Sequence, residues 1–136
     1  MSRTKTVLLW LLAGSMTAVG ITHFTDPEPF MRIVPPPLPA REMVLLSGVF
    51  EILGGLGLLV PKLRRTAAWG LVALFVAVFP ANIYMAVAGI QLDPANPMPS
   101  WAGWVRLPFQ ALFIYWAWSF TKVRVPGGKG QPNEAS

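Results

Sequence analysis

The stretch Leu46-Ser-Gly-Val-Phe-Glu-Ile-Leu-Gly-Gly-Leu-Gly-Leu-Leu-Val60 places one carboxylate, Glu51, near the middle of an otherwise uncharged and mostly apolar run. It belongs to one of four long apolar blocks, which run over about residues 6–22, 43–60, 66–90 and 102–120. Each block is close to the roughly 17–25 residues that a helix needs to cross a bilayer. Four such blocks leave little amphipathic surface to cover a soluble core in a chain of 136 residues. The sequence therefore predicts one all-α integral membrane domain over residues 1–121, an up-down four-helix transmembrane bundle.

The composition fits this class, because 54% of the residues are hydrophobic and only 12% are charged. An average soluble domain has about a quarter of charged residues. A basic start followed by an apolar run also describes a secretory signal peptide. The first run is long, however, and no A-x-A-like cleavage site follows it, so we interpret it as an uncleaved first span.

The eleven basic residues are distributed unevenly between the two sides that four spans would create. Eight of them precede the first span, separate the second from the third, or follow the fourth; they are Arg3, Lys5, Lys62, Arg64, Arg65, Lys122, Arg124 and Lys129. The positive-inside rule predicts that this side is cytoplasmic. Both termini are then cytoplasmic, with residues 122–136 as a flexible tail. The charge is explained by topology, so the bilayer is the expected partner and nucleic acid is not.

The connection between the first two spans carries signals of a short interfacial helix. Asp26 and Pro27 are typical of a helix start, and Phe30 and Met31 supply an apolar face. The prolines at 35–37 then end any helix. This segment is expected to lie on the outer membrane face, either as a lid over a pocket or as a loop among the lipid headgroups.

Several chemistries are excluded by residue type. The chain has no cysteine, which excludes thiolate catalysis and Cys-ligated clusters. A single histidine cannot supply a multi-His metal or haem site. Glycine-rich phosphate-binding and hydrolase motifs are also missing from the sequence. We therefore expect no metal site and no intrinsic cofactor.

The few polar side chains inside the spans are the candidate functional residues. A rise of about 1.5 Å per residue places Glu51 near the bilayer midplane and the others in the outer half. A charge costs at least about 2.5–3.5 kcal/mol at the centre of a membrane helix, so these groups should face inward and find partners. The candidate polar pocket consists of Ser47, Glu51, Asn82, Arg106, Gln110 and His23.

Two arrangements of these groups stay open. Glu51 could reach Arg106 if both side chains extend, or it could hydrogen-bond to Asn82 or Gln110 in its protonated form. The set could bind a ligand, or it could be a polar clasp that fixes helix register. Pro80 and Pro108 interrupt their helices near these residues.

Small residues mark expected contacts between the spans. Gly48 and Gly55 in the second span, and Gly70, Ala73 and Ala77 in the third, have the spacing of close-packing seams. They are expected to let neighbouring helices approach closely, with no further role.

The sequence resembles the DoxX/DoxX-like family of small four-span bacterial membrane proteins over nearly all of residues 5–121. The segments that carry the resemblance are Ala18–Phe24, Phe30 with Ile33–Pro36, Ser47–Glu51 with Gly54, Pro61 with Arg64-Arg65, and Phe79–Met85. The resemblance implies a four-helix bundle in the bacterial cytoplasmic (inner) membrane. Some members of that family are linked to oxidoreductase systems, including a thiosulfate:quinone oxidoreductase subunit. It implies no catalytic residues.

Three functions compete at this stage. The first is a subunit that binds a small molecule or a quinone and serves a redox enzyme, because an apolar bundle with one group of donors and an acid suits a quinone headgroup. The second is a proton-coupled transporter or lipid-handling protein, which would need a homo-oligomer. The third is a non-catalytic assembly subunit. Whether the chain is itself an enzyme stays open.

Overall fold

A computed structural model describes residues 1–123 as an all-helical chain. Within these residues there is no strand, and the predicted tail from residue 124 onward lies outside the described part. The helices are α1 (Arg3–Thr25), α2 (Glu28–Met31), α3 (Ala40–Leu59), α4 (Arg64–Ala88) and α5 (Trp101–Ser119). Three of them, α1, α3 and α4, are long and apolar enough to cross a membrane. The prediction of an all-α fold is therefore confirmed for the described residues, and three helices have the length and composition of the predicted spans; the fourth span and the topology stay predictions.

The long helices extend a few residues beyond some of the predicted blocks because of their caps. The Ser2 hydroxyl accepts the backbone N–H of Lys5 at 3.1 Å, so α1 starts before its apolar block. At the other end the Asp26 N–H donates to the Thr22 carbonyl. Asp26 therefore caps the end of α1, and the prediction that it starts the short helix is wrong; Pro27 occupies that place in α2.

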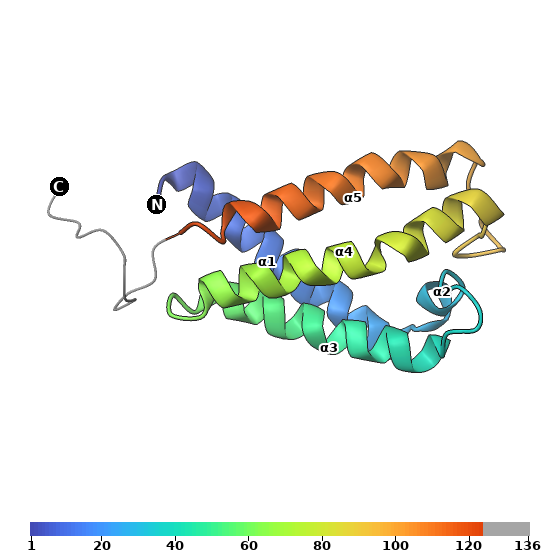
Figure 1. Cartoon of the computed structure of the whole chain (residues 1–136), viewed down its shortest axis with the longest axis horizontal. Helices are drawn as coiled ribbons and strands as arrows, with labels where there is room; N and C mark the ends of the chain where they lie inside the picture. Colours follow the sequence, from blue (N-terminus) through green and yellow to red (C-terminus); the bar gives the residue numbers. More distant parts are fainter. Residues whose placement is uncertain (124–136) are drawn as a thin grey trace, which may run out of the picture.

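Consecutive long helices run in opposite directions (Figure 1). The most extensive contact joins α1 to α3, followed by α4 with α5 and then α3 with α4, while α2 packs on α3. We call the end formed by residues 1–5, 60–65 and 120–123 the basic end, and the end formed by α2 and residues 89–100 the α2 end. Figure 1 shows these two ends at opposite sides of the bundle.

Helices α1 and α3 meet backbone to backbone. A Cβ atom on Gly48 would lie only 2.8 Å from His23 Cβ and 3.0 Å from the Gly20 carbonyl oxygen. Only glycine fits such an approach. The predicted seam in the second span is confirmed, and it brings the end of α1 against the middle of α3.

The seam predicted for the third span is wrong within the described chain. A Cβ atom on Gly70 would meet nothing within 4 Å, and Ala73 and Ala77 are exposed. Their spacing places them on an outward face of α4, together with exposed side chains such as Trp69 and Val76. Many large apolar side chains on the other helices are exposed in the same way, which fits contact with lipid.

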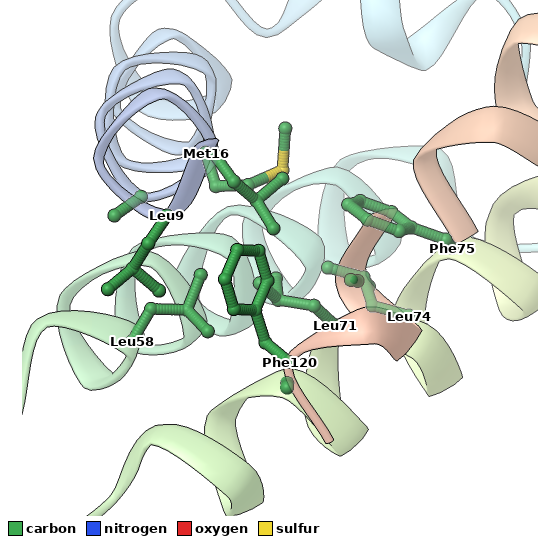
Figure 2. Packing of buried hydrophobic residues seen from close by; sticks show 11 residues of the cluster. Leu9, Met16, Leu58, Leu71, Leu74, Phe75 and Phe120 are labelled. Atoms are coloured by element: carbon green, nitrogen blue, oxygen red, sulfur yellow. The ribbon is translucent and has the colours of Figure 1, made fainter. Parts of the chain in front are cut away.

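The apolar core fills the half of the bundle nearer the basic end. Leu9 and Met16 of α1 belong to one cluster with Leu58 of α3, Leu71 of α4 and Phe120 (Figure 2). Leu12, Leu58, Leu71 and Phe120 are fully buried. The buried ionisable and amide side chains, which are His23, Glu51, Asn82 and Gln110, lie from the middle of the bundle toward the α2 end, whereas the buried Thr121 lies at the basic end. The positions of the first four along the helices agree with the predicted ones, and their placement in the outer half of a membrane stays a prediction.

Basic side chains bind helix carbonyls at the basic end. Arg64 Nε donates to the Leu58 carbonyl at 2.7 Å, and Arg65 Nε donates to the Thr121 carbonyl at 2.9 Å. Lys5 Nζ reaches the Ser119 carbonyl at 3.0 Å, which ties α1 to the end of α5. Cations stabilise the carbonyl end of a helix because the last carbonyls lack helical partners. These residues therefore have a structural role as well as the predicted topological one.

Candidate functional site

The only histidine and the central glutamate come together at the α1–α3 contact. His23 Nδ1 lies 3.4 Å from Glu51 Oε2, and the two residues are only 6% and 8% exposed. The glycine seam positions them, since a Cβ on Gly20 would lie 3.1 Å from Glu51 Cβ. Glu51 starts one helical turn nearer the basic end than Gly48, and its carboxyl group reaches back to the histidine ring.

The hydrogen bonds of this pair are incomplete. His23 Nδ1 lies 2.7 Å from the Val19 carbonyl oxygen. A carbonyl only accepts, so Nδ1 carries the proton and donates it to Val19. Glu51 Oε2 is buried and finds no hydrogen-bond partner among residues 1–123. The pair therefore presents an acceptor oxygen that nothing in the described chain satisfies.

Helix α2 covers the histidine. The Phe30 ring stacks on the His23 ring with centroids 3.9 Å apart and an angle of 14°. Phe30 is half-buried, and α2 also packs against α3. The sequence singled out Phe30 as part of the apolar face of the interfacial helix, but no pattern indicated that its ring meets His23. Of the two roles considered for this segment, a lid over a pocket or a loop among headgroups, the contact between Phe30 and His23 fits the lid.

Gln110 is used for a contact between α4 and α5. Its Nε2 donates to the Phe75 carbonyl at 2.8 Å, and the residue is 1% exposed. Pro80 lies inside α4 and cannot donate to the carbonyl of Val76, next to Phe75. The amide therefore fastens α5 to α4 close to this break in the helix ladder, which is the clasp role expected as one alternative.

Arg106 lies within α5, which begins at Trp101. The guanidinium group lies over the Phe113 ring, 5.3 Å from its centroid. Its Nη1 is buried and has no hydrogen-bond partner in the described chain. Among residues 1–123 no carboxylate oxygen lies within 4.0 Å of it, so the first of the two open arrangements, a pair with Glu51, is not formed.

The two remaining candidates lie apart from these contacts. Asn82 is buried at 5% exposure, and its side chain makes no hydrogen bond to any described residue. Ser47 is half-buried, one turn from Glu51. The structure thus joins His23 to Glu51, gives Gln110 a backbone partner, and leaves Arg106 with an unsatisfied nitrogen. The expected bonds from Glu51 to Asn82 or Gln110 are absent from the described residues.

Arg106 also lines a pocket between the α2 ends of α4 and α5. The pocket has a volume of about 170 Å³, and its wall is mostly apolar; it is formed by Met85, Gly89, Ile90, Gln91, Leu92, Met98, Pro99, Ser100, Ala102, Gly103 and Arg106. Gln91 folds the loop over it, since its Oε1 accepts the Met98 N–H at 2.7 Å and its Nε2 donates to the Met98 carbonyl at 3.1 Å. No sequence pattern predicted this pocket or the loop residues around it.

The same loop holds Asp93, which binds Asn96 and the Ala95 N–H at 2.9 and 3.0 Å. The side-chain bond from Asn96, helped by the Ala95 N–H, lowers the pKa of the Asp93 carboxyl. Asp93 is exposed and serves the turn. Within residues 1–123 no three His, Asp or Glu side chains are grouped to hold a metal ion.

Comparison with protein families gives one match that covers most of the chain. Residues 12–121 match the family described as "Domain of unknown function (DUF8561)". The chain belongs to this family. Comparison with curated proteins and with solved structures finds no match. The matched region contains all six predicted pocket residues. It also contains the three buried side-chain atoms that lack a hydrogen-bond partner among residues 1–123, which are Glu51 Oε2, Arg106 Nη1 and Trp116 Nε1.

Proposed function

We propose that this DUF8561 member is a four-span membrane protein that binds a quinone-type small molecule at His23 and Glu51 on behalf of a redox enzyme. The observation that carries the proposal is Glu51 Oε2, which is buried 3.4 Å from His23 Nδ1 and lacks a hydrogen-bond partner among residues 1–123. A buried acceptor without a partner costs about 1–3 kcal/mol, and more for a charged group. A ligand hydroxyl at this oxygen would remove that cost.

The membrane arrangement is part of the proposal. Helix α5 packs along α4 and would be the fourth span beside the three apolar helices. The cluster of Lys and Arg at the basic end supports a cytoplasmic position for that end, with both termini inside. The resemblance to DoxX-like proteins supports the bacterial inner membrane as the location. The site would then lie between the bilayer midplane and its outer surface.

A quinone suits both halves of the bundle. A quinone would supply two-electron, two-proton redox chemistry when bound, with the electrons coming from the partner enzyme. Glu51 would accept a hydrogen bond from a hydroxyl of the reduced, quinol form and take up or release its proton at Oε2. His23, fixed by Val19 and stacked against Phe30, would orient that carboxyl group. The exposed apolar helix faces would hold the isoprenoid tail in lipid.

Glu51→Gln is expected to reduce the quinone that stays with the protein by about tenfold or more. The substitution keeps the shape but weakens a hydrogen bond to a charged group, which contributes about 1.5–3 kcal/mol; about 1.4 kcal/mol is tenfold in affinity. The protein is excised from membranes with its native lipid by an amphipathic polymer. Quinone per protein, relative to phospholipid, is measured by mass spectrometry.

The matched control is Glu42→Gln, the same change at an exposed position in the first turn of α3. It should retain wild-type quinone. Wild-type protein with no quinone or other isoprenoid enriched over the bulk membrane would contradict the proposal. In that case, the transporter alternative would be supported if wild-type vesicles show pH-coupled uptake and Glu51→Gln vesicles do not. The assembly-subunit alternative would be supported if Glu51→Gln folds and functions as the wild type does.

A further inference from the structure

A second unpartnered polar atom lies outside the His23–Glu51 site. Arg106 Nη1 is buried in the α4–α5 hairpin and finds no acceptor in the part of the chain that the structure describes. Its residue lines the pocket of about 170 Å³ at the α2 end. The proposed quinone site does not use this pocket, whose lining comes from α4, α5 and the loop between them.

The amide and carboxylate side chains of the loop around the pocket are already engaged. Both ends of the Gln91 amide bind the backbone of Met98. Asp93, the acid of this loop, binds Asn96 and Ala95 and lies outside the distance of an ion pair with Arg106. The strongest donor left at the pocket is therefore the guanidinium group.

A guanidinium group stays charged in proteins and carries five N–H donors but no acceptor. The Phe113 ring, whose centroid is 5.3 Å from the guanidinium carbon, stabilises part of the positive charge. It accepts no hydrogen bond from the N–H groups that point outward in the guanidinium plane. The start of α5 adds further donors, because Ser100 makes no side-chain cap and the first turn has no acidic residue. Arg106 and this helix end favour the same kind of guest, an oxyanion.

We propose that this pocket binds the phosphate or carboxylate head of a small amphiphile, with Arg106 as the anion-binding residue. The volume is close to that of a 150 Å³ protein cavity that holds benzene, so the pocket accepts a head group and a short apolar segment. Met85, Ile90 and Leu92 supply apolar contacts for that segment. The head could come from a phospholipid at the membrane surface or from a free anion in water.

The test separates these two sources. Purified protein in phosphatidylcholine nanodiscs is titrated with inorganic phosphate and with octanoate by calorimetry. In parallel, protein in nanodiscs that contain phosphatidylglycerol is released and its retained lipid is counted by native mass spectrometry. Saturable binding of a free anion indicates the aqueous source, and retained phosphatidylglycerol indicates the lipid source; either one supports the proposal if it depends on Arg106.

Arg106→Gln is expected to weaken whichever binding is found by about tenfold or more, because a charge-assisted hydrogen bond is lost. Arg41→Gln, the same change at an exposed position of α3, should bind like the wild type. Ala102→Leu fills the pocket from its wall without altering Arg106, so it should also lose binding.

Equal binding by wild type and Arg106→Gln in every arm, no binding in any arm, or an equal loss in Arg41→Gln would overturn the proposal. If circular dichroism shows that Arg106→Gln does not fold, the test relies on Ala102→Leu. Binding by Ala102→Leu equal to that of the wild type would then overturn the proposal. Quinone retention by Arg106→Gln or Ala102→Leu is expected to be normal, since the proposed quinone site lies at the α1–α3 contact. The two proposals can therefore fail separately.

Discussion

Replacing Gly48 with alanine is expected to destabilise the protein by about 1–3 kcal/mol, the usual cost of overpacking. The new Cβ atom would lie 2.8 Å from His23 Cβ and 3.0 Å from a backbone oxygen of Gly20. The backbone of α1 would have to move away from α3. The quantity to measure is the free energy of unfolding in mixed detergent–lipid micelles, from the circular dichroism signal during titration with sodium dodecyl sulfate.

Gly70→Ala is the matched control for this change. Its Cβ would meet nothing within 4 Å, and alanine favours helix over glycine by roughly 0.5–1 kcal/mol. Gly70→Ala should therefore leave the protein as stable as the wild type or slightly more stable. If both alanine variants were stabilised alike, the backbone contact between α1 and α3 would be refuted.

Glu51→Lys is expected to destabilise the protein by about 3 kcal/mol or more. A cation at the centre of a membrane helix costs at least about 2.5–3.5 kcal/mol. It would also face His23 Nδ1, which already donates to Val19, so the new ammonium group would find no acceptor at that ring nitrogen. The same unfolding titration measures this loss, and a lower yield of folded protein from membranes should accompany it.

Glu42→Lys makes the same charge change at an exposed position of α3. Surface substitutions usually stay within about 0.5 kcal/mol of the wild type, so this variant should unfold normally. A Glu51→Lys variant as stable as Glu42→Lys would mean that water reaches position 51 freely. The burial that defines the candidate site would then be refuted.

The helices and the polar half of the bundle were predictable from the sequence because both follow from local composition. Apolar length predicts a long helix wherever it occurs. The position of Glu51 along α3 follows from a constant rise per residue. The glycine pair Gly48 and Gly55 was also recognisable, since small residues inside a membrane helix permit close approach.

The partners of the polar groups were not predictable, because they depend on how each helix is rotated about its axis. Glu51 faces His23 since the glycine seam sets the rotation of α1 against α3. Gln110 binds the Phe75 carbonyl, and a backbone acceptor leaves no pattern in the sequence. Gly70 resembles a seam residue in the sequence, yet it faces outward.

The six residues predicted to form one polar pocket therefore lie in separate places in the structure. His23 and Glu51 form the pair at the α1–α3 contact, and Gln110 connects α5 to α4. Arg106 belongs to a pocket whose other walls come from α4, α5 and the loop between them, which has no periodic pattern. The division matters for function, because an acid with a free acceptor and a guanidinium with a free donor suit different ligands.

The single histidine offers the most direct test of the central claim, that His23 and Glu51 form a ligand site. Protein labelled with ¹⁵N-histidine gives the signals of His23 alone. In phosphatidylcholine nanodiscs, Nδ1 is expected to carry the proton that binds Val19. A short-tailed quinol analogue should then shift the His23 ¹⁵N resonances saturably in wild type and in Glu42→Gln, but not in Glu51→Gln. Resonances that stay unchanged at saturating analogue, or that shift equally in Glu51→Gln, would contradict the account.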